Sequence, residues 1–173
     1  MKTKTILLVK SSIRKAIILT LLGFVFTELS YAQNCTASAT IVPPLQLIKT
    51  ADLSFGEIIA GTQDGQVSVG INNSRTANGG VQLVGKEDNL NTAAFDIQGF
   101  PNSSFTVSIP SFIFISQGSI DMKVENFVSS LGNTSTLDSR GVAALKVGAT
   151  LNVNANQPIG LYTGAFDVTV AYN

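Results

Sequence analysis

Residues 145–153 read LKVGATLNV, and in this segment apolar residues stand at nearly every second position. The polar residues Lys146, Thr150 and Asn152 lie between them. Side chains of a β-strand point alternately to its two faces, whereas an amphipathic helix repeats its apolar positions about every 3.6 residues. The alternation therefore predicts a strand with one face in the core and the other toward solvent.

The same spacing recurs through most of the chain after residue 33. These segments are rich in Val, Ile, Thr and Phe, which favour strands, and no convincing run of helical period accompanies them. Turns rich in Gly and Asn separate the segments, at 61–65, 72–80, 99–102 and 154–160. The clearest further strands are predicted at 66–71, 104–109 and 166–172, and weaker ones at 37–42, 45–49, 53–59, 81–84, 93–98, 112–115 and 121–128.

Many short strands with one apolar face each predict an all-β fold of two antiparallel sheets packed face to face, an immunoglobulin-like or pilin-like sandwich. A closed barrel is the alternative architecture. No composition shift or repeat marks a second domain, so we expect residues 33–173 to form one domain. Within it, the run FIFI at 112–115 is expected to be a strand buried on both faces.

The first 32 residues have the three parts of a secretory signal peptide. Basic residues between Lys2 and Lys15 precede an apolar run at 16–26, and Ser30-Tyr31-Ala32 supplies small residues for cleavage. The apolar run has 11 residues, whereas a spanning helix needs roughly 20. We therefore expect a signal peptide at 1–32, no membrane span in the mature chain, and export to the periplasm, the outer surface or the extracellular space.

Removal of that leader changes the charge balance. Residues 33–173 hold six basic and ten acidic residues, a net charge of −4. A mildly acidic chain without a basic cluster is not expected to bind nucleic acid. Cys35 is the only cysteine, so no intrachain disulfide is possible. We interpret Cys35 as an incidental small residue, with an intermolecular disulfide as the alternative.

The sequence holds few of the side chains on which enzyme and metal sites depend. It has no histidine, which excludes Ser-His-Asp and Cys-His catalysis and histidine metal ligands. Its carboxylates are scattered and show no calcium-loop spacing. Residues 80–86 place two glycines and a lysine at phosphate-loop spacing, but Glu87 stands where a Ser or Thr is needed. We predict no enzyme activity, no cofactor and no metal.

An apolar row marks the C-terminal end of the chain. Phe166, Val168, Val170 and Tyr172 alternate with more polar residues, and Gly160 stands upstream of them. A last strand with a free backbone edge and a regular apolar row is able to pair with the edge of another chain. The penultimate aromatic, the alternation and the glycine resemble the terminal strand of chaperone–usher pilus subunits, which their chaperone recognises.

A second alternating segment lies near the start of the expected mature chain. Ala37, Ala39 and Ile41 stand at period two within 33–42. A subunit is able to lend such a segment to a neighbouring copy as a donated strand. The alternative is that residues 37–42 pair within their own sheet.

Blocks spread over some 130 residues resemble, in the same order, the bacterial domain-of-unknown-function 4402 family. That family is similar to spore-coat-U-like and pilin-like β-sandwiches. The resemblance implies the fold and an exported location, and it brings no known active site. The matching blocks are Ala39–Val42, Asp52–Gly56, Gly79–Val81, Ala94–Phe95, Val147–Leu151 and Gly160–Val170.

Two functions follow from these features as expectations. The first is a secreted or cell-surface structural or adhesive protein, a pilin-like subunit whose partners are copies of itself or a periplasmic chaperone. The alternative is a self-complete, non-catalytic binding module for glycans or matrix. Exposed aromatic side chains would mark such a module, and Phe100 and Tyr162 are its candidates.

Overall fold

The computed structural model describes residues 31–85 and 90–173. The described residues contain strands and turns but no helix, so the prediction of an all-β antiparallel fold is confirmed. Accordingly, no helix in this part of the chain has the length and apolar character needed to cross a membrane. The predicted signal peptide at 1–32 lies almost wholly outside the described residues, so it stays a prediction. Glu87, which argued against a phosphate-binding loop, also lies outside the described residues.

Twelve strands are defined within residues 46–172 of the described chain, and all of their pairings are antiparallel. They are β1 (Gln46–Ala51), β2 (Ser54–Phe55), β3 (Glu57–Val69), β4 (Arg75–Val84), β5 (Leu90–Asn91), β6 (Ala93–Gln98), β7 (Ser104–Ser108), β8 (Phe112–Gln117), β9 (Ile120–Ser129), β10 (Thr134–Thr136), β11 (Val142–Val153) and β12 (Thr169–Tyr172).

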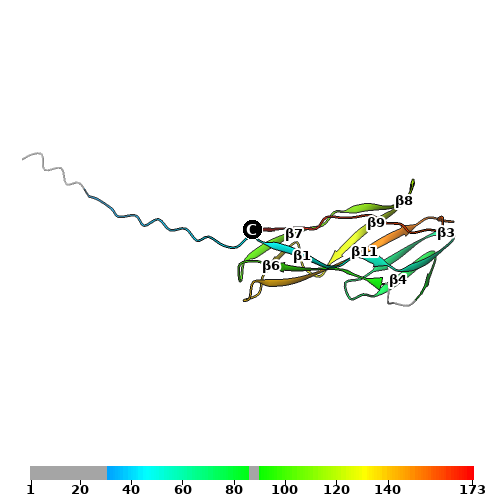
Figure 1. The fold of residues 1–173 in the computed structure, drawn as a ribbon, viewed down its shortest axis with the longest axis horizontal. Coiled ribbons are helices and arrows are strands. Elements are labelled where there is room, and N and C mark those ends of the chain that lie inside the picture. Colours follow the sequence, from blue (N-terminus) through cyan, green and yellow to red (C-terminus); the bar gives the residue numbers. More distant parts are fainter. Residues whose placement is uncertain (1–30, 86–89) are drawn as a thin grey trace, which may run out of the picture. The chain divides into compact units, whose positions relative to one another are not determined.

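The large sheet is organised around β11, the strand predicted from the 145–153 alternation. Along one edge of β11, the first half of the strand pairs with β6 and the second half pairs with β3. Beyond these two strands, β1 pairs with β6 and β4 pairs with β3. The opposite edge of β11 pairs with β9, and β9 pairs with β8. This seven-stranded sheet is curled into a half-barrel, with β11 at its centre (Figure 1).

Two smaller sheets complete the fold. One has the strand order β10-β7-β12, so that the last strand of the chain, β12, lies at its edge. The other is the short pair β2-β5. In Figure 1 the C-terminal end lies beside the start of β1, and a hydrogen bond from the Tyr172 hydroxyl to the Pro43 carbonyl (3.1 Å) joins these two regions.

The core consists of two clusters of buried side chains. One is built by the second half of β11 with β3, β4 and β9, and it includes Val67, Val124 and Leu151. The other is built by the first half of β11 with β6 and β7, and it includes Phe105 and Leu145. The three-stranded sheet therefore packs against the β6 end of the large sheet. The part of β11 between Val147 and Ala149 joins the two clusters.

The turn predicted at 61–65 is wrong, because β3 continues through it. The β3–β4 ladder shifts register between Ala60 and Gly65, which is a bulge rather than a turn. The glycines here allow the two backbones to approach closely: a Cβ on Gly61 would lie 2.4 Å from the Gly80 carbonyl oxygen. The turn predicted at 72–80 is shorter in the structure, where it spans residues 71–74, because β4 already begins at Arg75.

The prediction that 112–115 is buried on both faces is also wrong. Ile113 and Ile115 pack against the first core cluster, whereas Phe112 and Phe114 are 49% and 53% exposed. The physical reason is that β8 is an ordinary half-buried strand at the margin of the large sheet, with one face in the core and one toward solvent.

At the two ends of the chain, strands are shorter than predicted. Residues 31–45 form no strand, so the weaker candidate at 37–42 and an intrachain pairing of that segment are not found. At the C-terminal end only Thr169–Tyr172 is a strand, although Phe166 and Val168 still pack against the second core cluster. Small residues at 37 and 39 offer little apolar area to hold a strand against the sheet.

Candidate functional site

The inward-facing apolar row of residues 166–172, which ends in the last strand, is incompletely covered. Phe166, Val168, Val170 and Tyr172 all pack against the second core cluster, yet each is only half-buried. The residues between them, such as Thr169, are exposed. Phe166 contacts the ring of Phe127, with 5.1 Å between ring centroids. The alternation predicted for this row is therefore present, but its core-facing side remains accessible along part of its length.

A strand edge that has no hydrogen-bonded partner strand among the described residues runs beside this row. β12 pairs with β7 through the register Val170↔Val107 and Tyr172↔Phe105, and it is the last strand of its sheet. β1 pairs with β6 and is likewise the last strand of its own sheet. Both strands border the second core cluster, to which β1 contributes the half-buried Leu47. We refer to the border formed by β1 and residues 166–172 as the open edge.

One end of the open edge is closed by the side chain of Tyr172. Its hydroxyl accepts a hydrogen bond from the backbone N–H of Phe100 (2.7 Å) and donates one to the Pro43 carbonyl (3.1 Å). These bonds link the last strand, the turn after β6 and the residues that precede β1. Tyr172 thus fixes the spacing between the two strands that border the open edge, and no such side-chain link is found between residues 166–168 and β1 among the described residues.

The structure forms no strand from the candidate donor residues. Ala37, Ala39 and Ile41 lie in a segment without regular secondary structure, and all three are exposed. Ile41 is 98% exposed, the greatest exposure among the large apolar side chains of residues 31–45. The predicted contact strands therefore differ: Phe166, Val168, Val170 and Tyr172 are brought into one row, whereas the N-terminal three stay without a strand partner in the described chain. Their role in subunit contact stays a prediction.

A separate hollow of about 490 Å³ lies between the start of the β7–β8 connection and the end of β9. Its apolar lining includes Ile109, Phe127 and Leu131, with the amides of Asn126 and Asn133 beside them. Asn126 has a left-handed backbone φ of 52° where β9 bulges against β11. The lining contains no Asp, Glu, Lys, Arg, Cys or Tyr, so the hollow provides no side-chain acid or base. In residues 31–85 and 90–173, no three Asp, Glu or Cys side chains group closely enough to hold a metal ion.

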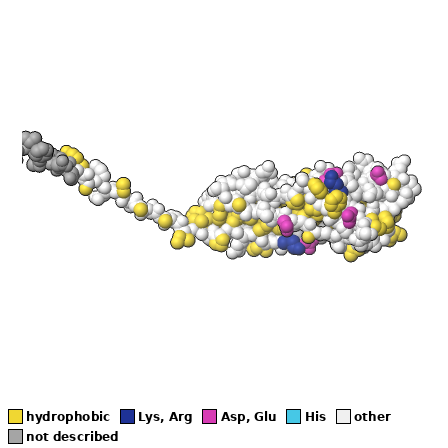
Figure 2. Space-filling model, turned by 90° about the horizontal axis from the view of Figure 1, so that it is seen from above, with side chains coloured by type: hydrophobic (Ala, Val, Ile, Leu, Met, Phe, Trp, Pro, Cys, Tyr) yellow, Lys and Arg dark blue, Asp and Glu magenta, His cyan; other side chains and the backbone are white. Residues whose placement is uncertain are grey.

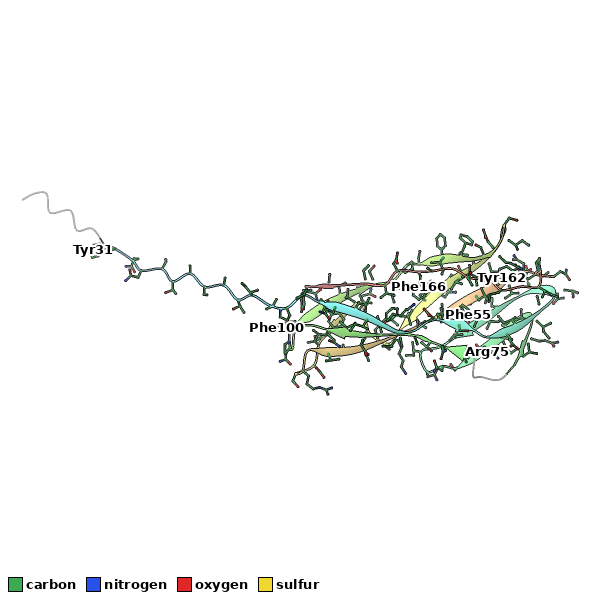
Figure 3. The ribbon with its side chains drawn as sticks, in the orientation of Figure 1. Tyr31, Phe55, Arg75, Phe100, Tyr162 and Phe166 are labelled. Carbon is green, nitrogen blue, oxygen red and sulfur yellow. The ribbon has the colours of Figure 1, made fainter. Side chains whose placement is uncertain are left out.

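The two aromatic residues that were candidates for ligand contact lie in different surroundings. Phe100 is 40% exposed in the turn after β6. Tyr162 is half-buried, packs against the first core cluster, and donates its hydroxyl to the Pro158 carbonyl (2.9 Å) (Figure 3). Phe112 and Phe114 form an exposed aromatic pair that was not expected from the sequence. Their period-two spacing is the signal that could have placed them on one outward face.

The outward Phe112 and Phe114 have polar neighbours on β9. The rings meet edge to face at 5.8 Å between centroids, and the Lys123 ammonium lies 5.1 Å from the Phe112 ring centroid. Lys123 also pairs with Glu125 at 2.6 Å. Hydrogen bonds from Lys123 and then from Asn152 lower the pKa of Glu125 below its ordinary value, so the carboxylate stays ionised in mildly acidic solution.

Residues 45–172 match the model of a domain of unknown function, DUF4402, and the chain belongs to that family. This confirms the resemblance drawn from the sequence blocks. The matched range begins just before β1 and ends on Tyr172, so it contains both strands of the open edge. No curated protein matches the chain.

Proposed function

We propose that this protein is an exported structural or adhesive subunit of the cell surface that assembles with copies of itself by strand donation. Residues 33–42 of one copy add to the open edge of the next copy, beside β12. The observation that carries this proposal is the half-buried apolar row at residues 166–172, which continues into the edge strand β12. Another strand laid along it would complete the burial of Phe166, Val168 and Val170.

Backbone chemistry supports the same pairing. An edge strand presents unpaired N–H and C=O groups, and an added extended segment satisfies them while its alternate side chains enter the core. Residues 33–42 are free of intrachain secondary structure and uncharged, which suits a segment that must enter an apolar site. A periplasmic chaperone that covered the same edge before assembly would fit this arrangement.

Within the donated segment, Ile41 is the expected anchor. Burying an isoleucine side chain is worth about 2 kcal/mol, whereas an alanine has a single methyl group and contributes far less. Ala37 and Ala39 would then serve mainly to let the donor backbone lie close to β12. Removing the side chain of Ile41 should weaken assembly more than any other single change in 33–42.

We also propose the finer architecture and the route of export. The curled large sheet and the three-stranded sheet are those of an immunoglobulin-like or pilin-like sandwich that lacks one strand at the open edge. The shared second core cluster, which has side chains from both sheets, supports this interpretation. Residues 1–32 act as the signal peptide, on the strength of their basic, apolar and small-residue sequence.

The proposal predicts the size of the protein in solution. Light-scattering chromatography of residues 33–173 should show oligomers that grow with concentration, and the same chain without 33–42 should elute as a monomer. In strand donation, residues 33–42 of one copy occupy the open edge of another copy. The chain without these residues has no segment to donate and therefore cannot assemble. A strictly monomeric 33–173 at every concentration, with elution unaltered by the deletion, would count against the proposal.

A further inference from the structure

The outward face of the large sheet carries two rows of side chains that cross the strands. One row runs from Phe112 on β8 to Glu125 on β9, Thr150 on β11 and Ser68 on β3. The register places a second row beside it, from Phe114 to Lys123, Asn152 and Gln66. Because the residues between them, such as Val124 and Leu151, are buried in the first core cluster, both rows lie on the opposite side of the sheet from that cluster, although Thr150 is itself buried at 9% exposure.

These polar side chains hold one another in place. Gln66 Nε2 donates to Asn152 Oδ1 (2.8 Å), and Asn152 Nδ2 donates to Glu125 Oε1 (2.8 Å). Glu125 pairs in turn with Lys123. In the other row the Ser68 and Thr150 hydroxyl oxygens are 2.9 Å apart. The network is thus preorganised, and each amide or ammonium in it retains hydrogens for a further acceptor.

The face combines this network with an aromatic margin and little net charge. Lys123 and Glu125 compensate each other, and the other members of the rows are uncharged. The exposed rings of Phe112 and Phe114 stand at the β8 end. Figure 2 shows hydrophobic side chains gathered in patches on one face of the domain, with a basic and an acidic side chain at the margin of one patch.

We propose that this outward face of β3, β11, β9 and β8 binds a neutral, extended polysaccharide. Sugar hydroxyls donate and accept hydrogen bonds as the amide side chains of Gln66 and Asn152 do, and the apolar face of a pyranose ring packs on an aromatic ring. Neighbouring strands are about 4.8 Å apart, which is close to the length of one sugar residue in an extended chain. The polar side chains of each row are therefore spaced at about the length of one sugar residue of such a polysaccharide.

The same observations disfavour other occupants. A stable protein interface has a desolvated apolar centre, whereas the centre of this face is a hydrogen-bonded polar network with its apolar rings at one margin. An anionic polymer needs an excess of basic side chains, and Lys123 is neutralised by Glu125. The face is also distinct from the open edge, which involves β1 and residues 166–172, so binding here does not depend on assembly.

The test is affinity electrophoresis of the full exported chain in native gels that contain hydroxyethylcellulose, laminarin, galactomannan or xylan. At least one neutral polysaccharide should retard the protein, and alginate, an anionic polymer, should not. The variants F114A and N152A should each weaken the retardation about tenfold. F100A removes an exposed ring in the turn after β6, at the other end of the domain from β8 (Figures 1 and 3), and should bind as the parent does.

Thermal melting of each variant separates binding from folding. F114A is expected to leave the melting temperature nearly unchanged, because the Phe114 ring is 53% exposed. N152A removes two side-chain hydrogen bonds of a half-buried residue and is expected to lower the melting temperature by a few degrees while the protein stays folded in the gel. Absence of retardation by all four neutral polysaccharides would overturn the proposal. So would retardation by alginate alone, an equal loss in F100A, or self-association that F114A abolishes without any polysaccharide present. Because the readout compares gels with and without polysaccharide, it stands even if strand donation fails.

Discussion

The variant Gly148→Ala is expected to lose about 3 kcal/mol of stability and to melt roughly 10 °C lower than the parent. A Cβ at this position would lie 2.1 Å from the Val69 carbonyl oxygen and 3.0 Å from a methyl group of Val128. Gly148 stands in β11 where one edge of the strand changes partner from β6 to β3. To relieve this overlap, β11 and β3 would have to move apart at the centre of the large sheet, where the two core clusters meet.

Gly132→Ala is the matched control for this prediction. Gly132 lies in an exposed connection, and the nearest atom to its added Cβ is the Thr134 carbonyl oxygen at 3.4 Å. Differential scanning calorimetry of both variants gives the comparison directly. Equal melting temperatures for Gly148→Ala and Gly132→Ala would show that the backbone contact between β11 and β3 is looser than described.

The second large effect is expected at Val170, in the apolar row of the open edge. Val170→Asp places a carboxylate opposite the buried Val107, and the domain should lose at least about 2 kcal/mol. The variant should also fail to assemble, because a donated strand would have to desolvate the new charge. Urea denaturation measures the stability change, and light scattering measures assembly.

Thr169→Asp adds the same charge to the same strand on its exposed side and should change stability by less than about 0.5 kcal/mol. Its assembly should remain close to that of the parent. If both Asp variants behave alike, the apolar row does not form the surface on which a second chain is received.

The sequence predicted most strands because their alternation depends only on local spacing. The segment 145–153 lies within β11, and 93–98 coincides with β6. The prediction failed at 61–65, where glycines that allow two strands to approach closely have the same composition as a turn. It failed again at 112–115, since a run of apolar residues does not reveal which of its two faces has a partner in the core.

The candidate site was predictable only in part. The alternation of residues 166–172 indicated an apolar row, and the structure places that row against the core. β1 borders the same edge only because the two sheets pack together. Since β1 and residues 166–172 are far apart in the sequence, no local pattern predicts that they lie side by side. The rows of the outward face depend likewise on register, because Gln66 and Asn152 are 86 residues apart in the chain and meet only once β3 pairs with β11.

The most direct test of strand donation is a calorimetric titration of the chain lacking residues 33–42 with a synthetic peptide of residues 33–44. We predict saturable binding at one peptide per chain and a rise in melting temperature, with a peptide carrying Ile41→Asp inactive at the same concentrations. Absence of binding, or equal binding of the two peptides, would contradict the account, because the open edge would then not be a site for the protein's own N-terminal segment.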